Sequence, residues 1–223
     1  MAKTLLALGG AGFADPDSAV LDGFALGLSG ATRPRICLLA TACGDASAYI
    51  QAFYRTFRER AQCSHLSLFQ REAREPRELL LEQDLLYIGG GSTANLLALW
   101  RLHRVDRAVR EAYEQGVILV GVSAGACALF EAGVSLSFGT LAALHDGLGV
   151  VRGGFAPHYR ERRAILLEMV QAGLSRGFGA GEDAGLLFRD GELEEAVSMR
   201  RGAEAAEVQA GPVETALEPR VLG

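Results

Sequence analysis

The segment from Val117 to Ala126 constrains this chain most, because it predicts both an order of elements and a reactive side chain. An apolar run rich in β-branched residues ends in a Gly-x-Ser-x-Gly motif centred on Ser123, and a helix-compatible stretch, 126–130, follows at once. This order predicts a strand, a tight turn and a helix, and the strained turn requires small residues at Gly121 and Gly125. Such a turn lifts the serine hydroxyl clear of a sheet and directs helix N–H groups toward a ligand. The alternative interpretation is an ordinary turn with a capping serine.

The composition favours one cytoplasmic domain spanning residues 1–223. Hydrophobic residues make up 49% of the chain, which is ample for a core, and 22% are charged. A net charge of −5 offers no basic surface to nucleic acid or to an anionic membrane. The first apolar run, Leu5–Leu8, is far too short for a signal peptide, and no run approaches the roughly 18 apolar residues of a membrane span. The four cysteines follow no disulfide or metal spacing, so we expect no metal.

Several apolar runs predict a mostly parallel sheet. They are continuous rather than alternating, which is typical of strands covered on both faces by helices, and they comprise residues 3–8, 35–40, 65–69, 84–88 and 117–122. We expect helices that open at Asp15 and after Ser47, and helices over 71–82, 94–115 and 160–172. The glycine-rich stretch 131–154 predicts loops or short hairpins. Two short runs, 186–188 and 196–199, predict a C-terminal β-hairpin at the edge of the sheet.

Two glycine-rich turns follow predicted strands. The first, Gly9–Gly12, lacks the third glycine of a dinucleotide fingerprint, so we expect no nucleotide cofactor. The second, Gly89–Gly91, has more glycines than a plain turn needs and permits a ligand to approach the backbone at the carboxyl end of a strand. We therefore expect the N–H groups of Ala124 and of Gly90 or Gly91 to form an oxyanion hole.

A serine hydroxyl is a poor nucleophile unless a base removes its proton, and histidine titrates near neutral pH. Of the four histidines, His158 is best placed, because it follows the rigid Pro157 at the end of a strand, 35 residues after Ser123. The others are a histidine that alternates with apolar residues, one on an exposed helix and one in a loop, namely His65, His103 and His145. The sequence therefore predicts that His158 is the base.

The order of several separate motifs resembles one family, the serine peptidases that include peptidase E, an aspartyl dipeptidase, and cyanophycinase. The matching segments span nearly the whole chain and comprise Leu6–Gly10, Thr41–Asp45, Tyr87–Thr93, Gly121–Gly125 and Pro157–Tyr159. The resemblance implies an α/β class I glutamine amidotransferase-like fold, with helices on both sides of a mostly parallel sheet, and neither a metal nor a cofactor. It also implies that Ser123 is the nucleophile and His158 the base, and that the protein is a homodimer that cleaves peptides at aspartyl residues.

The chain departs from this resemblance at the third catalytic residue. Relatives carry an aspartate in the motif Gly-Val-(Ser/Thr)-Asp-Ser-Phe-Gly, where this chain has Leu136. A leucine cannot hold the histidine tautomer or stabilise the imidazolium, and loss of that role costs about 10,000-fold in turnover. Four acids are candidate substitutes: Glu131, Asp146, Glu182 and Asp183. We favour Glu182, because it follows a glycine-rich stretch in a place that resembles the acid-bearing strand end of cyanophycinases; the alternative is a surface carboxylate.

Two arginines just past the histidine, Arg160 and Arg163, resemble arginines of peptidase E. One of them would pair with the substrate's aspartyl carboxylate, although solvated helix arginines are the alternative. The sequence thus predicts a cytoplasmic serine peptidase that acts on small acidic peptides through an acyl-enzyme. The alternatives are a peptidase with non-aspartyl specificity, since relatives have aspartate where Arg160 stands, and a catalytically impaired binding or regulatory protein.

Overall fold

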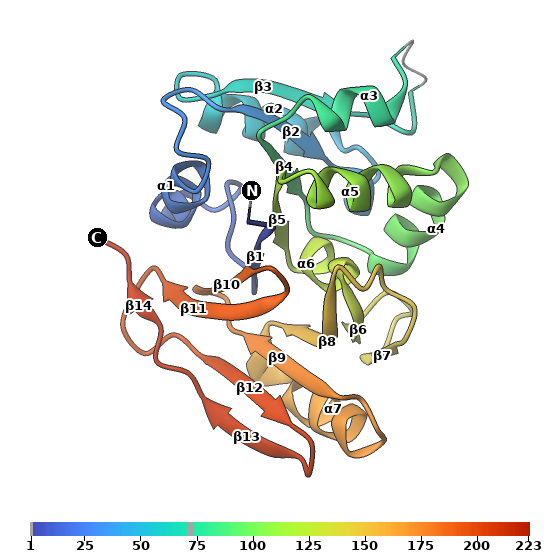
Figure 1. The fold of residues 1–223 in the computed structure, drawn as a ribbon, viewed down its shortest axis with the longest axis vertical. Helices are drawn as coiled ribbons and strands as arrows, with labels where there is room; N and C mark the ends of the chain where they lie inside the picture. Colours follow the sequence, from blue (N-terminus) through green and yellow to red (C-terminus); the bar gives the residue numbers. More distant parts are fainter. Residues whose placement is uncertain (1, 71–73) are drawn as a thin grey trace.

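Two β-sheets, rather than the single sheet expected, organise the chain in the computed structural model, which describes residues 2–70 and 74–223 (Figure 1). Within these residues the first sheet has eight strands, in the spatial order β14 (Arg220–Val221), β11 (Glu192–Ser198), β10 (Ala184–Arg189), β1 (Thr4–Leu8), β5 (Ile118–Val122), β4 (Leu85–Ile88), β2 (Arg35–Leu39) and β3 (Gln62–Leu66). The second has six, in the order β13 (Val213–Ala216), β12 (Ala205–Gln209), β9 (Arg176–Ala180), β8 (Val151–Pro157), β6 (Phe130–Ser135) and β7 (Ala142–Leu144).

The heart of the first sheet is the predicted parallel one. Strands β1, β5, β4, β2 and β3 are parallel neighbours, and their side chains alternate between two apolar cores. Helices α1 (Ala19–Gly27) and α2 (Ser47–Phe57) cover one face; α3 (Pro76–Leu81), α4 (Thr93–His103), α5 (Val105–Glu114) and α6 (Ala124–Leu129) cover the other. This confirms the expected α/β fold. Across residues 2–70 and 74–223, no helix is both long enough and apolar enough to cross a bilayer.

The second sheet includes the stretch 131–154, for which we expected loops or short hairpins. Strands β6 and β7 do form an antiparallel hairpin there, but β6 also pairs with β8 in a larger sheet that we did not expect. Two of its strands, β8 and β9, contain two glycines each, and the low strand propensity of glycine makes such strands hard to recognise in the sequence. Gly133 in β6 shows why glycine is needed, because a Cβ there would stand 2.3 Å from the Cys127 sulfur on α6. Helix α7 (Tyr159–Gln171) covers the outer face of this sheet, and α6 lies between the two sheets (Figure 1).

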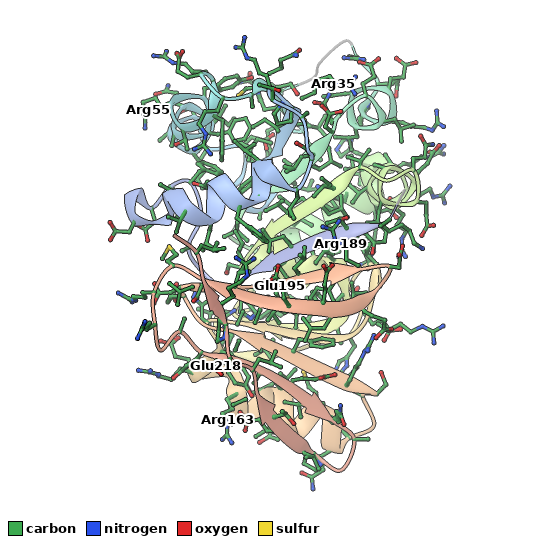
Figure 2. The ribbon with its side chains drawn as sticks, turned by 60° about the vertical axis from the view of Figure 1, so that its left-hand side comes forward. Arg35, Arg55, Arg163, Arg189, Glu195 and Glu218 are labelled. Carbon is green, nitrogen blue, oxygen red and sulfur yellow. The ribbon has the colours of Figure 1, made fainter. Side chains whose placement is uncertain are left out.

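Aromatic rings join the two sheets into one core. Phe188 on β10 of the first sheet makes edge contacts with Phe130 and Phe178 on the second, with ring centroids 5.4 and 5.0 Å apart. The predicted hairpin is confirmed as β10 and β11, but it lies one strand inside the edge, because β14 pairs with β11. Glu195 on β11 (Figure 2) accepts hydrogen bonds at both carboxylate oxygens from Arg220 on β14, at 2.9 and 3.0 Å. This ion pair joins the last strand to its neighbour.

Smaller differences concern element ends. The helix expected over 94–115 is two helices, since Arg104 adopts a left-handed conformation with φ of 59° and the bend buries Val105 at the start of α5. The helix expected to open at Asp15 begins as a 3₁₀ turn, Pro16–Ser18, and the third strand ends at Leu66 rather than Phe69. Of the helix expected over 71–82, α3 accounts for the last turn and a half, and residues 71–73 lie outside the described residues.

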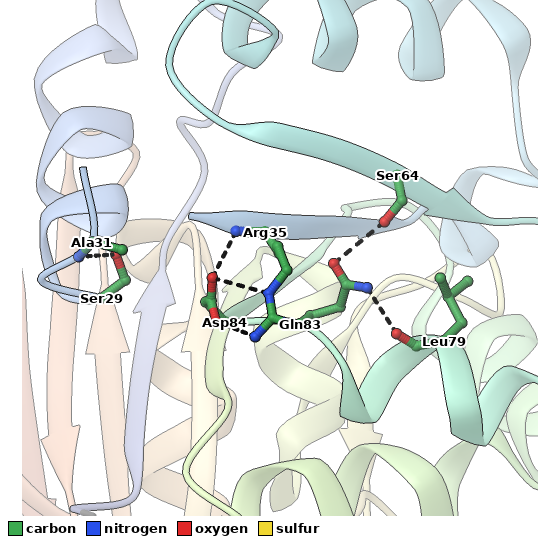
Figure 3. A network of polar contacts seen from close by, with 7 residues as sticks. All are labelled: Ser29, Ala31, Arg35, Ser64, Leu79, Gln83 and Asp84. Atoms are coloured by element: carbon green, nitrogen blue, oxygen red, sulfur yellow. Dashed lines mark hydrogen bonds and ion pairs between the residues drawn. The ribbon is translucent and has the colours of Figure 1, made fainter. Parts of the chain in front are cut away.

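Polar contacts connect the amino ends of the parallel strands, at the edge of the sheet opposite their carboxyl ends. Asp84, just before β4, accepts hydrogen bonds from the backbone and guanidinium of Arg35 at the start of β2, at 2.8 and 2.7 Å (Figure 3). Next to it, Ser64 on β3 donates to Gln83, whose amide donates to the Leu79 carbonyl (Figure 3). These contacts connect three neighbouring strands and fix their register.

A carboxyl group is buried between α1 and the sheet. Asp22 is 1% exposed, and it accepts hydrogen bonds from the Tyr87 hydroxyl at 3.1 Å and the Ser18 hydroxyl at 3.2 Å. Burial disfavours the charged form and raises the pKa of Asp22 to about 6, although both hydrogen bonds oppose the shift. The folded protein therefore holds this proton more tightly than the unfolded chain does.

This burial predicts a pH-dependent contribution to stability. The protonated Asp22 favours folding below about pH 4, and that contribution is lost as the pH rises through about 6. Between pH 4.5 and 7.5 the free energy of unfolding of the wild type should fall, relative to Asp22→Asn, by on the order of 2 kcal/mol. Urea unfolding of both proteins at the two pH values measures this difference. An unchanged difference would mean that Asp22 titrates as it does in the unfolded chain.

Candidate active site

The turn that follows β1 connects the ends of both sheets. Four backbone hydrogen bonds of 2.8–3.2 Å converge on it: Ser123 N–H to the Leu8 carbonyl, His158 N–H to the Gly9 carbonyl, Gly9 N–H to the Ala184 carbonyl, and Ala11 N–H to the Glu182 carbonyl. The turn therefore places residues from the ends of β5, β8 and β9 beside one another. These are the three residues that the sequence singled out as nucleophile, base and acid.

Ser123 lies on the strand-turn-helix segment that the motif predicts. It connects β5 to α6 with φ of 50° and ψ of −109°, a strained conformation for a residue with a side chain. The residues two positions before and after it must be glycines. A Cβ on Gly125 would stand 2.3 Å from the Ile88 carbonyl oxygen, and a Cβ on Gly121 would stand 2.6 Å from the Ala126 Cα. The backbone strain is thus held in place by close contacts on both sides of the serine.

His158 joins Ser123 to a carboxylate. It ends β8 in the left-handed conformation, with φ of 50° and ψ of 51°, and its Nε2 lies 2.8 Å from the Ser123 Oγ. Its Nδ1 is hydrogen-bonded to Oε1 of Glu182, which follows β9. The side chain of His158 is 24% exposed and that of Glu182 is 62% exposed, so solvent reaches the outer end of this chain of contacts. The structure therefore brings together the serine, the histidine and the acid that the sequence favoured.

A glycine that the sequence did not assign to the site lies behind the carboxylate. A Cβ on Gly10 would stand 1.8 Å from Oε2 of Glu182, so the carboxylate packs directly against the Gly10 backbone. Neighbouring Gly9 is equally constrained, since a Cβ there would stand 2.0 Å from the Gly181 carbonyl oxygen. The Gly-Gly pair after a strand was visible in the sequence, but Glu182, against which Gly10 packs, lies more than 170 residues away.

The other three candidate acids are engaged by groups other than His158. Glu131 lies on β6 and accepts a hydrogen bond from the Gly153 N–H at 2.7 Å. Asp146 pairs with Arg101, and Asp183 accepts a hydrogen bond from Arg200 at 2.7 Å. Leu136, where relatives carry aspartate, follows β6 and is 54% exposed.

The glycine triplet after β4 borders the serine. A Cβ on Gly90 would stand 3.5 Å from the Ser123 Cβ, and Gly91 adopts φ of 140° with its backbone against the Ala42 carbonyl. Ala124 begins α6, and the first N–H groups of a helix have no carbonyl partner within it. Of the residues expected to form an oxyanion hole, Gly90 and Ala124 thus lie next to Ser123, whereas Gly91 packs against Ala42.

The two arginines expected to bind substrate are engaged by carboxylates of the chain itself. Arg160 donates from Nε and Nη2 to Oε1 of Glu204, at 2.9 and 2.7 Å. Arg163 donates from Nε to Glu214 on β13, at 2.7 and 2.9 Å, and lies near the last hairpin (Figure 2). A cavity of about 250 Å³ adjoins the site on the Arg160 side, and its lining includes His158, Glu182, Asp183, Arg200 and Glu204.

A serine, an imidazole and a carboxylate joined by hydrogen bonds are the means by which serine hydrolases activate a hydroxyl group. The fold and this arrangement together define a serine hydrolase of the mixed α/β class. Within residues 2–70 and 74–223, no three His, Cys, Asp or Glu side chains gather as a metal site would require.

The chain belongs to peptidase family S51, whose family model matches residues 5–196. It is 41% identical to the uncharacterized peptidase YgaJ of Bacillus subtilis (strain 168). The match extends over 224 residues and covers 97% of this chain and 96% of that relative. The resemblance to the peptidase E family is thereby confirmed, and the chain is a serine peptidase.

Two solved structures share the fold. The crystal structure of a peptidase from an acI-B1 Actinobacterium matches 98% of this chain and 95% of its own, with a TM-score of 0.75 and 18% identity. A putative peptidase E protein from Listeria monocytogenes EGD-e matches 90% of this chain and all of its own, with a TM-score of 0.67 and 16% identity. Helices, sheets and their order are therefore those of peptidase E-like structures.

The contact between Gly10 and Glu182 predicts the effect of adding one methyl group. In Gly10→Ala the new Cβ would displace the Glu182 carboxylate from His158, and a misplacement of about 1 Å can cost 100-fold in rate. We expect the rate at which a fluorophosphonate labels Ser123 to fall at least tenfold. Gly27→Ala is the matched control, since a Cβ there meets nothing within 4 Å. Equal labelling rates in the two variants would show that the carboxylate position does not matter.

Proposed function

We propose that this protein hydrolyses small peptides at an aspartyl residue, through an acyl-enzyme formed on Ser123. The observation that carries the proposal is the chain of hydrogen bonds from the Ser123 Oγ through both nitrogens of His158 to Glu182. A serine hydroxyl in contact with a histidine nitrogen at 2.8 Å is within the range that proton transfer needs.

The reaction proceeds in two halves. His158 Nε2 takes the proton of Ser123 as Oγ attacks the peptide carbonyl, and then gives that proton to the departing amine. A water molecule, deprotonated by the same nitrogen, then attacks the acyl carbon; the ester bond to Oγ breaks, His158 returns the proton to Oγ, and the acid product leaves. Glu182 accepts the Nδ1 proton in a hydrogen bond, which fixes the tautomer and stabilises the imidazolium that forms within each half of the reaction.

The carbonyl oxygen of the substrate becomes negatively charged when Ser123 attacks, and it then needs hydrogen-bond donors. The N–H groups of Ala124 and of Gly90 or Gly91 border Ser123, and backbone donors fixed in place stabilise such an oxygen without reorganisation. Losing one donor costs about 100- to 1,000-fold in turnover in serine hydrolases. The strained backbone at Ser123 supports this role, because it orients the turn toward the start of α6.

For the acidic group of the substrate, the resemblance to peptidase E favours Arg160 and Arg163. Each would have to leave the carboxylate that it holds, Glu204 or Glu214, when substrate binds. A peptidase of different specificity is the second candidate, favoured by this engagement of both arginines. A cytoplasmic location and a homodimer stay predictions of the sequence.

Reactivity and specificity can be tested separately. We expect a fluorophosphonate to label the wild type at Ser123 and to leave Ser123→Ala unlabelled, as peptide mass mapping would show. We also expect Asp-Leu to be cleaved at least tenfold faster than the uncharged isostere Asn-Leu, by kcat/KM. Absence of labelling would support the impaired, ligand-binding alternative, whereas labelling without a preference for Asp-Leu would reject the aspartyl specificity alone.

The role of the acid has its own test. Glu182→Gln keeps the size of the side chain but cannot stabilise an imidazolium, and analogous changes cost up to about 10,000-fold in kcat. Because Glu182 is open to solvent, we expect a loss of at least about 100-fold. Glu168→Gln, an exposed carboxylate on α7, is the control and should stay within twofold. A Glu182→Gln variant with turnover within twofold of the wild type would remove this residue from the mechanism.

A further inference from the structure

A second cavity lies next to the one that adjoins His158. It has a volume of about 370 Å³, within the range of sites that bind small ligands, and it lies between α7 and the last hairpin, β12 and β13 (Figure 1). Four residues line both cavities, namely Tyr159, Arg160, Ala203 and Glu204. The two cavities are therefore neighbours, and together they extend from His158 to the last hairpin.

The lining of the second cavity is apolar and electrically neutral. Apolar residues of the hairpin and of the positions beside it line this cavity: Ala203, Ala205, Ala206, Ala216 and Leu217. The charged residues of the lining pair with one another. Arg160 forms an ion pair with Glu204. Arg163 and the Tyr159 hydroxyl both donate to Glu214. The cavity therefore presents apolar surface to a ligand, and each charged residue that lines it already has a partner of opposite charge.

Ala216 on β13 offers a way to fill this cavity. Glu214 and Ala216 lie two residues apart and share one face of the strand, and Glu214 contacts Arg163 of α7 on that face. Thr215, between them, points to the opposite face and lines neither cavity. Both Ala216 and Thr215 are exposed, so a larger side chain can replace either one without entering the core.

The first cavity lies on the side of the site from which the amine departs. In the proposed reaction His158 gives a proton to that amine, so the leaving half of the peptide must lie beside the imidazole. His158 lines the first cavity, whereas Gly90 and Ala124, which border Ser123 on the side of the carbonyl oxygen, line neither. A peptide bound in this orientation would place its first leaving residue in the first cavity and the next residue in the second.

We propose that the second cavity is a binding site for the apolar side chain of the second residue after the scissile bond. This inference rests on the proposed function and extends its substrates to peptides of three or more residues, such as Asp-Gly-Leu. A leucine side chain in this cavity would lose contact with water and gain apolar neighbours, which is favourable. A charged side chain would lose its water without finding an unpaired charge in the lining.

The first test compares kcat/KM for cleavage of Asp-Gly-Leu and of Asp-Gly-Gly after the aspartate. Burial of a leucine side chain corresponds to about a 10- to 100-fold effect, so we expect the wild type to prefer Asp-Gly-Leu at least tenfold. In Ala216→Phe the ring would fill the cavity, and we expect the preference to fall to about twofold through loss of Asp-Gly-Leu cleavage. Thr215→Phe adds the same ring on the opposite face of β13 and should keep the wild-type preference.

Three results would overturn the proposal. A wild type that cleaves Asp-Leu but neither tripeptide has no site for a second leaving residue. Equal kcat/KM values for the two tripeptides would show that the leucine is not buried. A preference that survives in Ala216→Phe would place the leucine elsewhere. Urea unfolding shows whether either added ring disturbs the fold. If Ala216→Phe does not fold, Ala216→Val provides the test, with an intermediate preference expected.

A binding measurement separates this inference from the proposed function. We expect Ser123→Ala to bind Asp-Gly-Leu at least tenfold more tightly than Asp-Gly-Gly in calorimetry, and the additional change Ala216→Phe to remove this difference. If the wild type hydrolyses no peptide but the difference in binding is found, the proposed function fails and the inference stands. If Asp-Leu is hydrolysed and the two tripeptides bind equally, the inference fails and the proposed function stands.

Discussion

The site depends on the backbone hydrogen bonds of one short turn. Leu8, Gly9 and Ala11 bond to the backbones of Ser123, His158 and Glu182, which come from the ends of three strands in two different sheets. Only a glycine at position 10 leaves space for the Glu182 carboxylate. The serine belongs to the parallel sheet, whereas the histidine and the acid belong to the second sheet, so this turn is what holds the reacting groups in register with one another.

The sequence predicted the parallel sheet and the site better than it predicted the second sheet. Ser123 and His158 lie in local motifs whose geometry follows from a few neighbouring residues, and Glu182 was found because it follows a glycine-rich strand end. The second sheet was missed because β6, β8 and β9 contain glycines at positions where Cys127, Leu166 or Tyr159 packs against the strand. Glycine there reflects a contact with a distant element, and a local pattern contains no information about that element.

The arginines show a related limit. Arg160, Arg162 and Arg163 look equivalent in the sequence, and only the positions of Glu204 and Glu214, 44 and 51 residues further on, distinguish them. Arg160 and Arg163 each pair with one of these carboxylates, whereas Arg162 donates to the Val134 carbonyl. Ion pairs between distant residues depend on the tertiary fold, so a prediction from neighbouring residues could name a basic segment but could not say which of its arginines pair with an acid of the chain.

The order of strands around His158 has a consequence for related proteins. In the second sheet β8 lies between β9 and β6, both parallel to it, so two strand ends flank the histidine: one leads to Glu182 and the other to Leu136. An acid can therefore reach the histidine from either side without any change of fold. A missing aspartate after β6 is, by this reasoning, no sign of an inactive protein until the end of β9 has been inspected.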